Sequence, residues 1–423
     1  MISPTLPLTW AALADLAPAE PDRIHGPTNA QSRLRLFDQS REAVRVVLYR
    51  DHHAWCPYCH KVWLWLEERR VPYAVRKVSM SCYGDKEPWY RQRVPSGMLP
   101  ALELDGRLIT ESDHILDALE ASFGPLGLSL QATEVMQVRR QERTLFGAWC
   151  DWLCRAPGGT RGDRQAEHRF SDAASALEEL IAASPGPLAL AGFSVADVVL
   201  APFLERMAAS LAYYKGVLLR QRHPRIDRWF RAMEQRAAYL GTQSDFHTHA
   251  HDLPPQLGGC VARGDGSQRQ LALQIDAGPW PISTGALADA ETSQPEPASA
   301  AGQALQRVLH HRRVLLSRMQ AHQPQQEPAL LDRALRCALT ALILGAAVPP
   351  PAATAASLRQ LRDRICVPRD MPLHAARRLR QALEATARLD PLDPQAQGPT
   401  LPLQHRRDQD PVLFQPVTGG VPA

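Results

Sequence analysis

Two cysteines separated by a proline and a tyrosine, Cys56 and Cys59, form the most chemically specific pattern in this 423-residue chain. They lie between a β-rich run at 44–49, expected to be a buried strand, and a helical periodicity at 59–69. A cysteine at a helix N-terminus faces unpaired amides and the positive end of the helix dipole, which stabilise a thiolate. We therefore expect Cys56 to act as the nucleophile, and Cys59 to attack a mixed disulfide formed there.

Other cysteines and histidines give weaker signals. A Cys-x-x-Cys pair is also half of a zinc site, but no second such pair lies nearby, so a redox role is favoured. His247, His249 and His251 could bind a metal, but they fall in a segment rich in proline and glycine, where we expect them to be solvated. Cys150 and Cys154 are expected to pack as small apolar residues on a helix that lines the cleft for a second substrate. We predict no metal site.

Two further motifs could hold the ends of a peptide-like thiol. Pro100 directly precedes an expected strand and would face the cysteines, which favours a cis peptide bond that turns the backbone of Leu99 outward. The alternative is an ordinary trans proline at the start of a strand. Ser112 follows the last strand and is a natural helix N-cap. Its hydroxyl and the adjacent amides could instead hold a ligand carboxylate, while Glu111 accepts from a ligand ammonium group.

The elements around these residues predict a thioredoxin-like α/β domain with the order βαβαββα. A strand, helix and strand this closely spaced imply a right-handed parallel βαβ unit. Asp105-Gly106 is the strongest short-range signal for a two-residue hairpin turn. The expected strands are 44–49, 73–78, 101–104 and 107–109, and the expected helices are 59–69, 86–90 and 112–123.

The chain after residue 132 loses its strand signals, which predicts an all-α domain with a capping box from Ser194 to Asp197. Beyond Leu240 the composition favours a connector, with a short strand at 271–275, followed by a small helical unit and a disordered tail. The expected helices are 135–154, 172–183, 195–211, 226–238, 305–319, 330–343, 358–365 and 375–389. The predicted organisation is an N-terminal extension (1–42), a thioredoxin-like domain (43–125), an all-α domain (132–241), a connector (242–299), a small helical extension (300–390) and a disordered tail (391–423).

Composition excludes several classes of protein. Eight cysteines are far fewer than a secreted disulfide scaffold carries. No apolar run reaches the length of a membrane span, and the first thirty residues do not resemble a secretory signal, so we expect a cytoplasmic protein without a membrane partner. From residue 300 onward there are sixteen arginines and no lysines against nine acidic residues. These arginines alternate with leucines at helical spacing, so we interpret them as solvated helix faces and expect no nucleic-acid partner.

The combination of the cysteine motif, the Leu99-Pro100 pair, Glu111-Ser112 and the capping box at 194–197 resembles a cytosolic glutathione transferase. Most members of that family carry serine or tyrosine as the catalytic residue. This chain has a glutaredoxin-like dithiol, which resembles the omega and lambda groups, and its long C-terminal region resembles the iota class. The resemblance covers about 44–240.

The resemblance also implies a role for each matching residue, with glutathione as co-substrate. Cys56 would form the mixed disulfide with glutathione. The glutathione-binding residues it implies are Tyr58, Lys86 at the glycyl carboxylate, Leu99 and Pro100 at the cysteinyl part, and Glu111 and Ser112 at the γ-glutamyl end.

The sequence thus predicts a glutathione-dependent thiol transferase that acts on a glutathionylated or electrophilic small molecule or protein, with weak conjugating activity and a homodimeric assembly. Two alternatives remain. A thioredoxin-like oxidoreductase of protein disulfides would need Cys59 and no glutathione. A non-catalytic protein would bind glutathione or an apolar ligand and dock a partner through its terminal helices.

Overall fold

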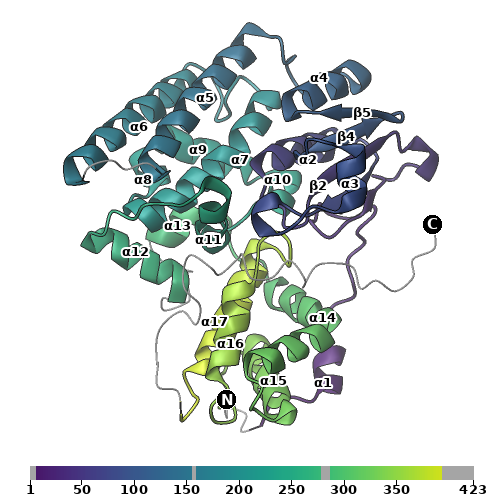
Figure 1. Cartoon of the computed structure of the whole chain (residues 1–423), viewed down its shortest axis with the longest axis vertical. Helices are drawn as coiled ribbons and strands as arrows, with labels where there is room; N and C mark the ends of the chain where they lie inside the picture. The colour runs from purple at the N-terminus through teal and green to yellow at the C-terminus, as the bar shows by residue number, and fades with distance from the viewer. Residues whose placement is uncertain (1–5, 155–158, 278–285, 393–423) are drawn as a thin grey trace.

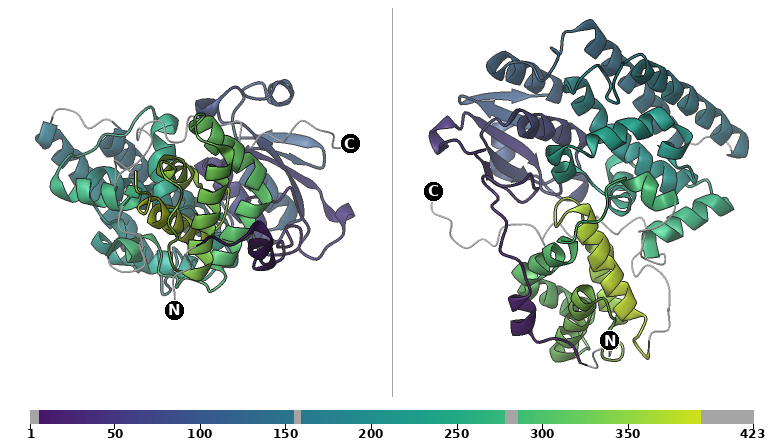
Figure 2. Two further views of the ribbon diagram at one scale, coloured as in Figure 1. Left: turned by 90° about the horizontal axis from the view of Figure 1, so that it is seen from below. Right: turned by 180° about the vertical axis from the view of Figure 1, so that it is seen from behind.

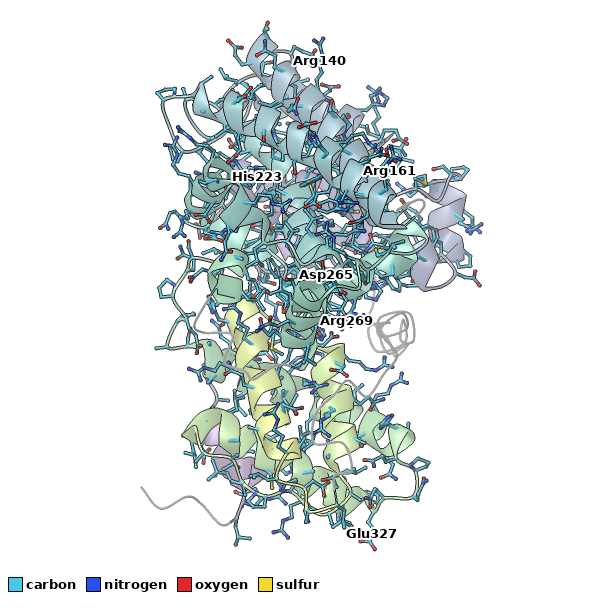
Figure 3. The ribbon with its side chains drawn as sticks, turned by 90° about the vertical axis from the view of Figure 1, so that its left-hand side faces the viewer. Arg140, Arg161, His223, Asp265, Arg269 and Glu327 are labelled. Carbon is cyan, nitrogen blue, oxygen red and sulfur yellow. The ribbon has the colours of Figure 1, made fainter. Side chains whose placement is uncertain are left out.

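The structure is a computed structural model that describes residues 6–154, 159–277 and 286–392. A mixed sheet and its helices lie beside a larger helical domain, and a small helical bundle lies at one end of the long axis (Figure 1). Seen from the side, Arg140 of the helical domain and Glu327 of the bundle mark the two ends of the molecule (Figure 3). Among the described residues, no helix combines the length and the apolarity that crossing a bilayer requires.

The sheet has five strands in the order β1-β3-β2-β4-β5. β2 (Val46–Asp51) pairs in parallel with β3 (Tyr73–Val78), and β4 (Ala101–Leu104) pairs antiparallel with both β2 and β5 (Arg107–Thr110). Together with α2 (Pro57–Arg69), α3 (Pro88–Arg93) and α4 (Ser112–Phe123), these strands confirm the predicted βαβαββα order.

The two faces of the sheet have separate apolar cores because side chains alternate along each strand. On β2, Val46 and Leu48 belong to the main core with α2 and α4, whereas Tyr49 packs with Tyr90 of α3 on the opposite face. The hairpin between β4 and β5 turns at Asp105-Gly106, as predicted, with φ of 51° and 80° at these two residues. The pairing of the strands therefore places the first residues of α2, β4 and α4 on the same side of the domain.

The N-terminal extension is more ordered than the sequence predicts, because ordered structure begins well before residue 44. β1 (Leu34–Arg35) adds an antiparallel strand to β3. α1 (Trp10–Asp15) lies against the terminal bundle, where the fully buried Leu13 joins the core of that bundle. Two residues in a strand and six in a helix are too few to leave a periodic signal.

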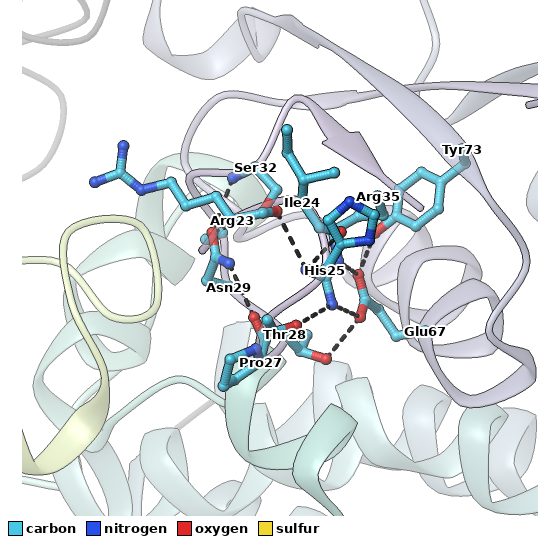
Figure 4. Close-up of polar contacts among 12 residues, drawn as sticks. Arg23, Ile24, His25, Pro27, Thr28, Asn29, Ser32, Arg35, Glu67 and Tyr73 are labelled. Atoms are coloured by element: carbon cyan, nitrogen blue, oxygen red, sulfur yellow. Dashed lines mark hydrogen bonds and ion pairs between the residues drawn. The ribbon is translucent and has the colours of Figure 1, made fainter. Parts of the chain in front are cut away.

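A buried ion pair fastens this extension to α2. Arg35 Nε donates to Glu67 Oε1 at 2.9 Å, and both side chains are almost completely inaccessible. Tyr73 and Thr28 donate their hydroxyls to the same carboxylate, each at 2.6 Å, and the Arg35 guanidinium also donates to the Gly26 carbonyl (Figure 4). Because every charged atom has a partner, the pair is compatible with burial.

The all-α domain consists of α5 (Thr133–Cys154), α6 (Gly159–Ala182), α7 (Val195–Ser210), α8 (Leu219–Arg222), α9 (Pro224–Met233) and α10 (Ala237–Thr242), with a π-helical turn η3 (Leu211–Lys215) after α7. All sixteen residues of α7 are buried, so this helix forms the centre of the domain. The predicted capping box is confirmed, since the Ser194 hydroxyl accepts from an amide of the first turn and the Asp197 carboxylate accepts from the Ser194 amide. The single helix expected at 226–238 was wrong, because the chain turns between α9 and α10.

Much of the described part of the connector predicted at 242–299 is helical. It contains α11 (Phe246–Leu257), α12 (Gly266–Ala277) and α13 (Ala286–Glu291). The strand expected at 271–275 lies inside α12, and that prediction was wrong. The two prolines inside α11 and the flanking glycines hide the helical pattern, while tertiary burial supplies the stabilisation that local propensity lacks.

The terminal bundle has the four predicted helices, α14 (Ala300–His322), α15 (Pro328–Leu344), α16 (Ala355–Arg364) and α17 (Leu373–Ala387). The α16–α17 loop and the start of α17 point toward the other two domains (Figure 2). The interpretation of the arginines as solvated was wrong for several of them. Arg359 and Arg362 are buried against Glu384, and Arg380 is buried against Asp245 of the connector. Residues 393–423 of the predicted disordered tail lie outside the described residues.

We expect Glu67→Gln to lower the free energy of unfolding by about 3–5 kcal/mol, because it leaves the Arg35 charge buried without its counter-ion. The measurement is chemical denaturation of the full chain. The double variant Arg35→Met/Glu67→Gln should regain much of the loss. The matched control is Arg45→Gln in the exposed Arg45–Asp105 pair, which should cost less than about 1 kcal/mol. Equal losses in the buried and exposed pairs would contradict the prediction.

Candidate active site

Cys56 is the N-cap residue of α2, directly after the loop that leaves β2. Its Sγ accepts from the Cys59 amide at 3.4 Å and lies 4.0 Å from the Leu99 carbonyl oxygen. Pro57 occupies the first helical position, where a missing amide hydrogen costs nothing. Both cysteines are free thiols, and Cys56 is the more accessible of the two. The sulfur therefore lies where the end of the helix favours negative charge.

Cys59 is buried one turn further along α2. Burial raises the pKa of Cys59 well above its usual value, and the adjacent Cys56 and Asp51 raise it further. Cys59 is thus held as a neutral thiol next to the more accessible sulfur. This asymmetry is consistent with the predicted division of roles between the two residues.

The loop before Cys56 is fixed from both domains. Asp51, at the end of β2, accepts from the Trp55 amide at 2.7 Å. Arg206 of α7 donates to the Trp55 carbonyl and, at 2.6 Å, to the Pro202 carbonyl. The ring of His53 stacks on Trp55 with centroids 4.3 Å apart. The sequence analysis did not predict these contacts with the loop. The single arginine within the apolar run of α7 was the one feature of the sequence that could have indicated them.

A loop of the terminal bundle closes the rear of the same site. Cys366 packs with Trp55 and Tyr83 in a small apolar cluster, and the Arg369 guanidinium lies 5.7 Å from the centre of the Trp55 ring. The Gln31 side chain donates to the Arg369 carbonyl at 2.7 Å. This bundle loop, residues 366–369, therefore contacts both the N-terminal extension and the loop that precedes the nucleophile.

The predicted cis peptide bond between Leu99 and Pro100 is confirmed. The predicted N-cap at Ser112 was wrong, because Glu111 is the N-cap residue, with φ of 64°, and Ser112 is the first residue of α4. Glu111 is exposed and Ser112 is buried. Their backbone amides still lie at the N-terminus of α4, where a carboxylate is favoured.

Lys86 lies behind the dithiol and is largely buried, with its Nζ donating to the Ser79 carbonyl at 2.7 Å. Burial lowers the pKa of Lys86, whereas Cys59, Glu87 and Cys56 act in the opposite direction. Lys86 thus interacts electrostatically with both sulfurs. The glycyl-carboxylate role implied for it stays a prediction.

An aromatic wall faces the open side of α2. Tyr58, which is 36% exposed, meets Phe203 of α7 edge to face with ring centroids 5.8 Å apart. Phe146 of α5 lies 5.3 Å from Phe203, and the Arg143 guanidinium covers both rings at 4.9 and 4.6 Å. The sequence analysis expected α5 to line the cleft for a second substrate but did not identify these side chains.

Three further cysteines, Cys150, Cys154 and Cys260, pack against the main core. Cys150 and Cys154 are half-buried on α5 and pack against the main core, in line with the packing role expected of them. Cys260 lies beside Cys154, and the hydrogen bond between them raises the pKa of Cys260.

The fold and the site define a thioredoxin-like domain with a dithiol at a helix N-terminus, followed by an all-α domain that supplies the aromatic wall. Residues 55–122 match the family model for the N-terminal domain of glutathione S-transferase, and residues 162–232 match the model for its C-terminal domain. The two matches fall on the sheet domain and on the all-α domain, and neither reaches the connector or the terminal bundle.

Known proteins resemble about half of the chain. "Glutathione S-transferase DHAR2" of Arabidopsis thaliana is 27% identical over 191 residues, which cover 45% of this chain and 84% of that protein. "Glutathione S-transferase L2, chloroplastic" of the same plant is 25% identical over 220 residues, covering 51% and 73%. Among solved structures, the trimeric glutathione transferase TDR1 of Leishmania is 26% identical with a TM-score of 0.43, and the match covers 55% of this chain and 49% of that one.

Glu87, next to Lys86, provides a test of the loop behind the dithiol. Although burial opposes ionisation, hydrogen bonds from His52 and Ser79 lower the pKa of Glu87 to about 2. A carboxyl group with a lowered folded-state pKa stabilises the fold above its unfolded pKa of 4.5, and this stabilisation is lost as the pH falls toward 2.

We therefore expect Glu87→Gln to be less stable than the unmodified protein at pH 6, with the difference shrinking as the pH falls to about 3. Denaturant unfolding at a series of pH values measures this difference. Glu134→Gln on the exposed start of α5 is the matched control and should show little change. A Glu87→Gln difference that stays constant or grows on acidification would refute the assignment.

Proposed function

We propose that this protein is a glutathione-dependent thiol transferase that removes glutathione from mixed disulfides. The observation that carries the proposal is the position of the Cys56 sulfur at the N-terminus of α2, between the Cys59 amide and the Leu99 carbonyl. A helix N-terminus stabilises the thiolate that such an exchange requires. Two relatives that are named glutathione S-transferases support the same conclusion.

The reaction proceeds by two thiol–disulfide exchanges. The Cys56 thiolate attacks the glutathione sulfur of a mixed disulfide, so that a Cys56–glutathione disulfide forms while the original S–S bond breaks. The other half of the mixed disulfide, the acceptor, leaves as a thiolate and takes up a proton. A second glutathione thiolate then attacks the glutathione sulfur on Cys56, which releases oxidised glutathione and restores the Cys56 thiolate. Alternatively, Cys59 attacks Cys56, releases reduced glutathione and leaves a protein disulfide that further glutathione reduces.

The raised pKa of Cys59 favours the first route, because a neutral thiol is a poor nucleophile. Glutathione would bind with its γ-glutamyl end at Glu111 and Ser112, its cysteinyl backbone along Leu99 and Pro100, and its sulfur beside Tyr58. The side chain of Lys86 would provide a positive charge behind the sulfur.

The aromatic wall provides the acceptor site. Phe146, Phe203 and Tyr58 offer ring surfaces, and the charge of Arg143 is paired with Glu142, so a flat apolar acceptor is favoured. Conjugation to electrophiles would be weak, because a nucleophilic Cys56 captures the glutathione sulfur instead of activating it. We further propose a cytoplasmic homodimer whose chemistry at Cys56 uses glutathione and no metal.

We expect Cys56→Ser to lose at least about 99% of the activity in a coupled assay that follows reduction of a small glutathione mixed disulfide. Cys59→Ser should retain most of the activity, because the first route does not use it. Cys337→Ser, in the core of the terminal bundle, is the control and should leave the rate unchanged.

Mass spectrometry after incubation with oxidised glutathione should show one glutathionyl group on Cys56 in Cys59→Ser. Full activity of Cys56→Ser would overturn the proposal. Reduction of protein disulfides that requires Cys59 and proceeds without glutathione would identify the dithiol oxidoreductase instead. Glutathione binding without turnover in any assay would identify a non-catalytic binding protein.

A further inference from the structure

A second group of chemically capable side chains lies in the connector, away from the dithiol. His247 and His251 are four residues apart on α11, so both project from one face of that helix. Asp276, near the end of α12, faces them. One ligand atom from each of the three residues lies within 4.8 Å of the other two, and all three side chains are buried. This burial contradicts the expectation that these histidines are solvated.

The geometry of the three groups is that of a ligand set. His251 Nε2 lies 2.7 Å from Asp276 Oδ1, and the rings of His247 and His251 have centroids 4.9 Å apart at an angle of 66°. Two imidazoles four residues apart on a helix and a carboxylate from elsewhere form a recurring donor set for divalent transition metals. Tetrahedral bonds of about 2.0–2.1 Å separate the donors by about 3.3 Å, so His251 and Asp276 would part by about half an ångström.

The carboxylate is oriented by a neighbouring hydroxyl. Tyr213, in the π-helical turn η3, donates to Asp276 Oδ2 at 2.7 Å, which leaves Oδ1 directed at the histidines. The edge of the Tyr213 ring also packs against His251. Such outer hydrogen bonds orient metal ligands and increase their affinity, and π-helical turns are frequent at functional sites.

The three donors come from helices that are anchored differently. The backbone of α11 is held by the Tyr214 hydroxyl on the Ala250 carbonyl at 2.7 Å and by the Tyr83 hydroxyl on the Asp252 carbonyl at 2.8 Å. α12 begins near Asp265 and Arg269, on the outside of the molecule between the helical domain and the bundle (Figure 3). A bond from α11 to Asp276 would therefore tie an outer helix to the central part of the protein.

We propose that His247, His251 and Asp276 bind one divalent transition-metal ion of the Zn²⁺ type, which links α11 to α12. Two neutral nitrogen donors and one carboxylate oxygen suit an ion of intermediate softness, since Ca²⁺ and Mg²⁺ prefer oxygen donors throughout. The ion neutralises the buried carboxylate. Three protein ligands leave one coordination position for a water molecule.

The test uses the full chain with Cys56→Ser and Cys59→Ser introduced together, because the dithiol could itself bind Zn²⁺. After treatment with a chelator and dialysis, the protein is incubated with Zn²⁺, and bound metal is measured by elemental mass spectrometry. We expect one equivalent per chain, a rise in the unfolding temperature with Zn²⁺, and visible absorption bands of four- or five-coordinate Co²⁺ when Co²⁺ replaces it.

Four further variants in this background locate the ion. His247→Gln, His251→Gln and Asp276→Asn should each weaken Zn²⁺ binding by at least about a hundredfold, and Tyr213→Phe by about tenfold. His249→Gln is the matched control on the same helix. Its side chain is directed at Glu205 and Asp252, so this variant should retain one equivalent.

His247→Gln is the decisive variant, since it leaves the His251–Asp276 contact intact and circular dichroism can confirm that it folds. Less than about 0.2 equivalents of Zn²⁺ or Co²⁺ on the parent protein would overturn the proposal. So would full binding by a folded His247→Gln protein, or an equal loss of binding in His249→Gln. None of these outcomes depends on transferase activity, so the proposal can fail while the proposed function stands.

Discussion

The hydrogen bond from Arg206 to the Trp55 carbonyl connects the all-α domain to the loop that precedes Cys56. The arginine lies in the middle of α7, which is buried along its whole length, and it is 1% exposed. Burying a guanidinium costs free energy unless it is hydrogen-bonded, and the carbonyls of Trp55 and Pro202 accept from its two terminal nitrogens. The position of Cys56 is thereby determined by the all-α domain as well as by its own sheet.

The parts of the fold that were predicted correctly depend on local signals. The hairpin at Asp105-Gly106, the cis bond before Pro100 and the capping box at Ser194 each follow from the chemistry of a few adjacent residues. The dithiol at the start of α2 is recognisable for the same reason, because a strand, two cysteines and a helix occur in immediate succession. Such local signals can be recognised without knowledge of the tertiary contacts that these residues make.

The parts that were missed depend on partners far away in the sequence. From its sequence context Arg380 is expected to be solvated. The fold places Asp245, 135 positions earlier, against it. From its sequence context His251 is expected to lie in a loop. The fold instead places it beside Asp276, on a helix that contains two prolines and is stabilised by burial. The aromatic wall combines residues of three helices, and the spacing of Tyr58 and Phe203 in the sequence does not indicate their contact. Sequence patterns report periodicity within an element, whereas these features are contacts between elements.

The loop of the terminal bundle at residues 366–369 has a consequence for how this chain can be divided. It lies on Trp55 and is bonded to Gln31, while α1 inserts Leu13 into the core of the bundle. Segments that precede and follow the sheet domain and the all-α domain in the sequence are therefore packed against each other and against the loop that precedes Cys56. Excising these domains would expose the rear of the loop that carries the nucleophile and would separate α1 from its packing partners. The terminal bundle is thus part of the packing around the candidate active site.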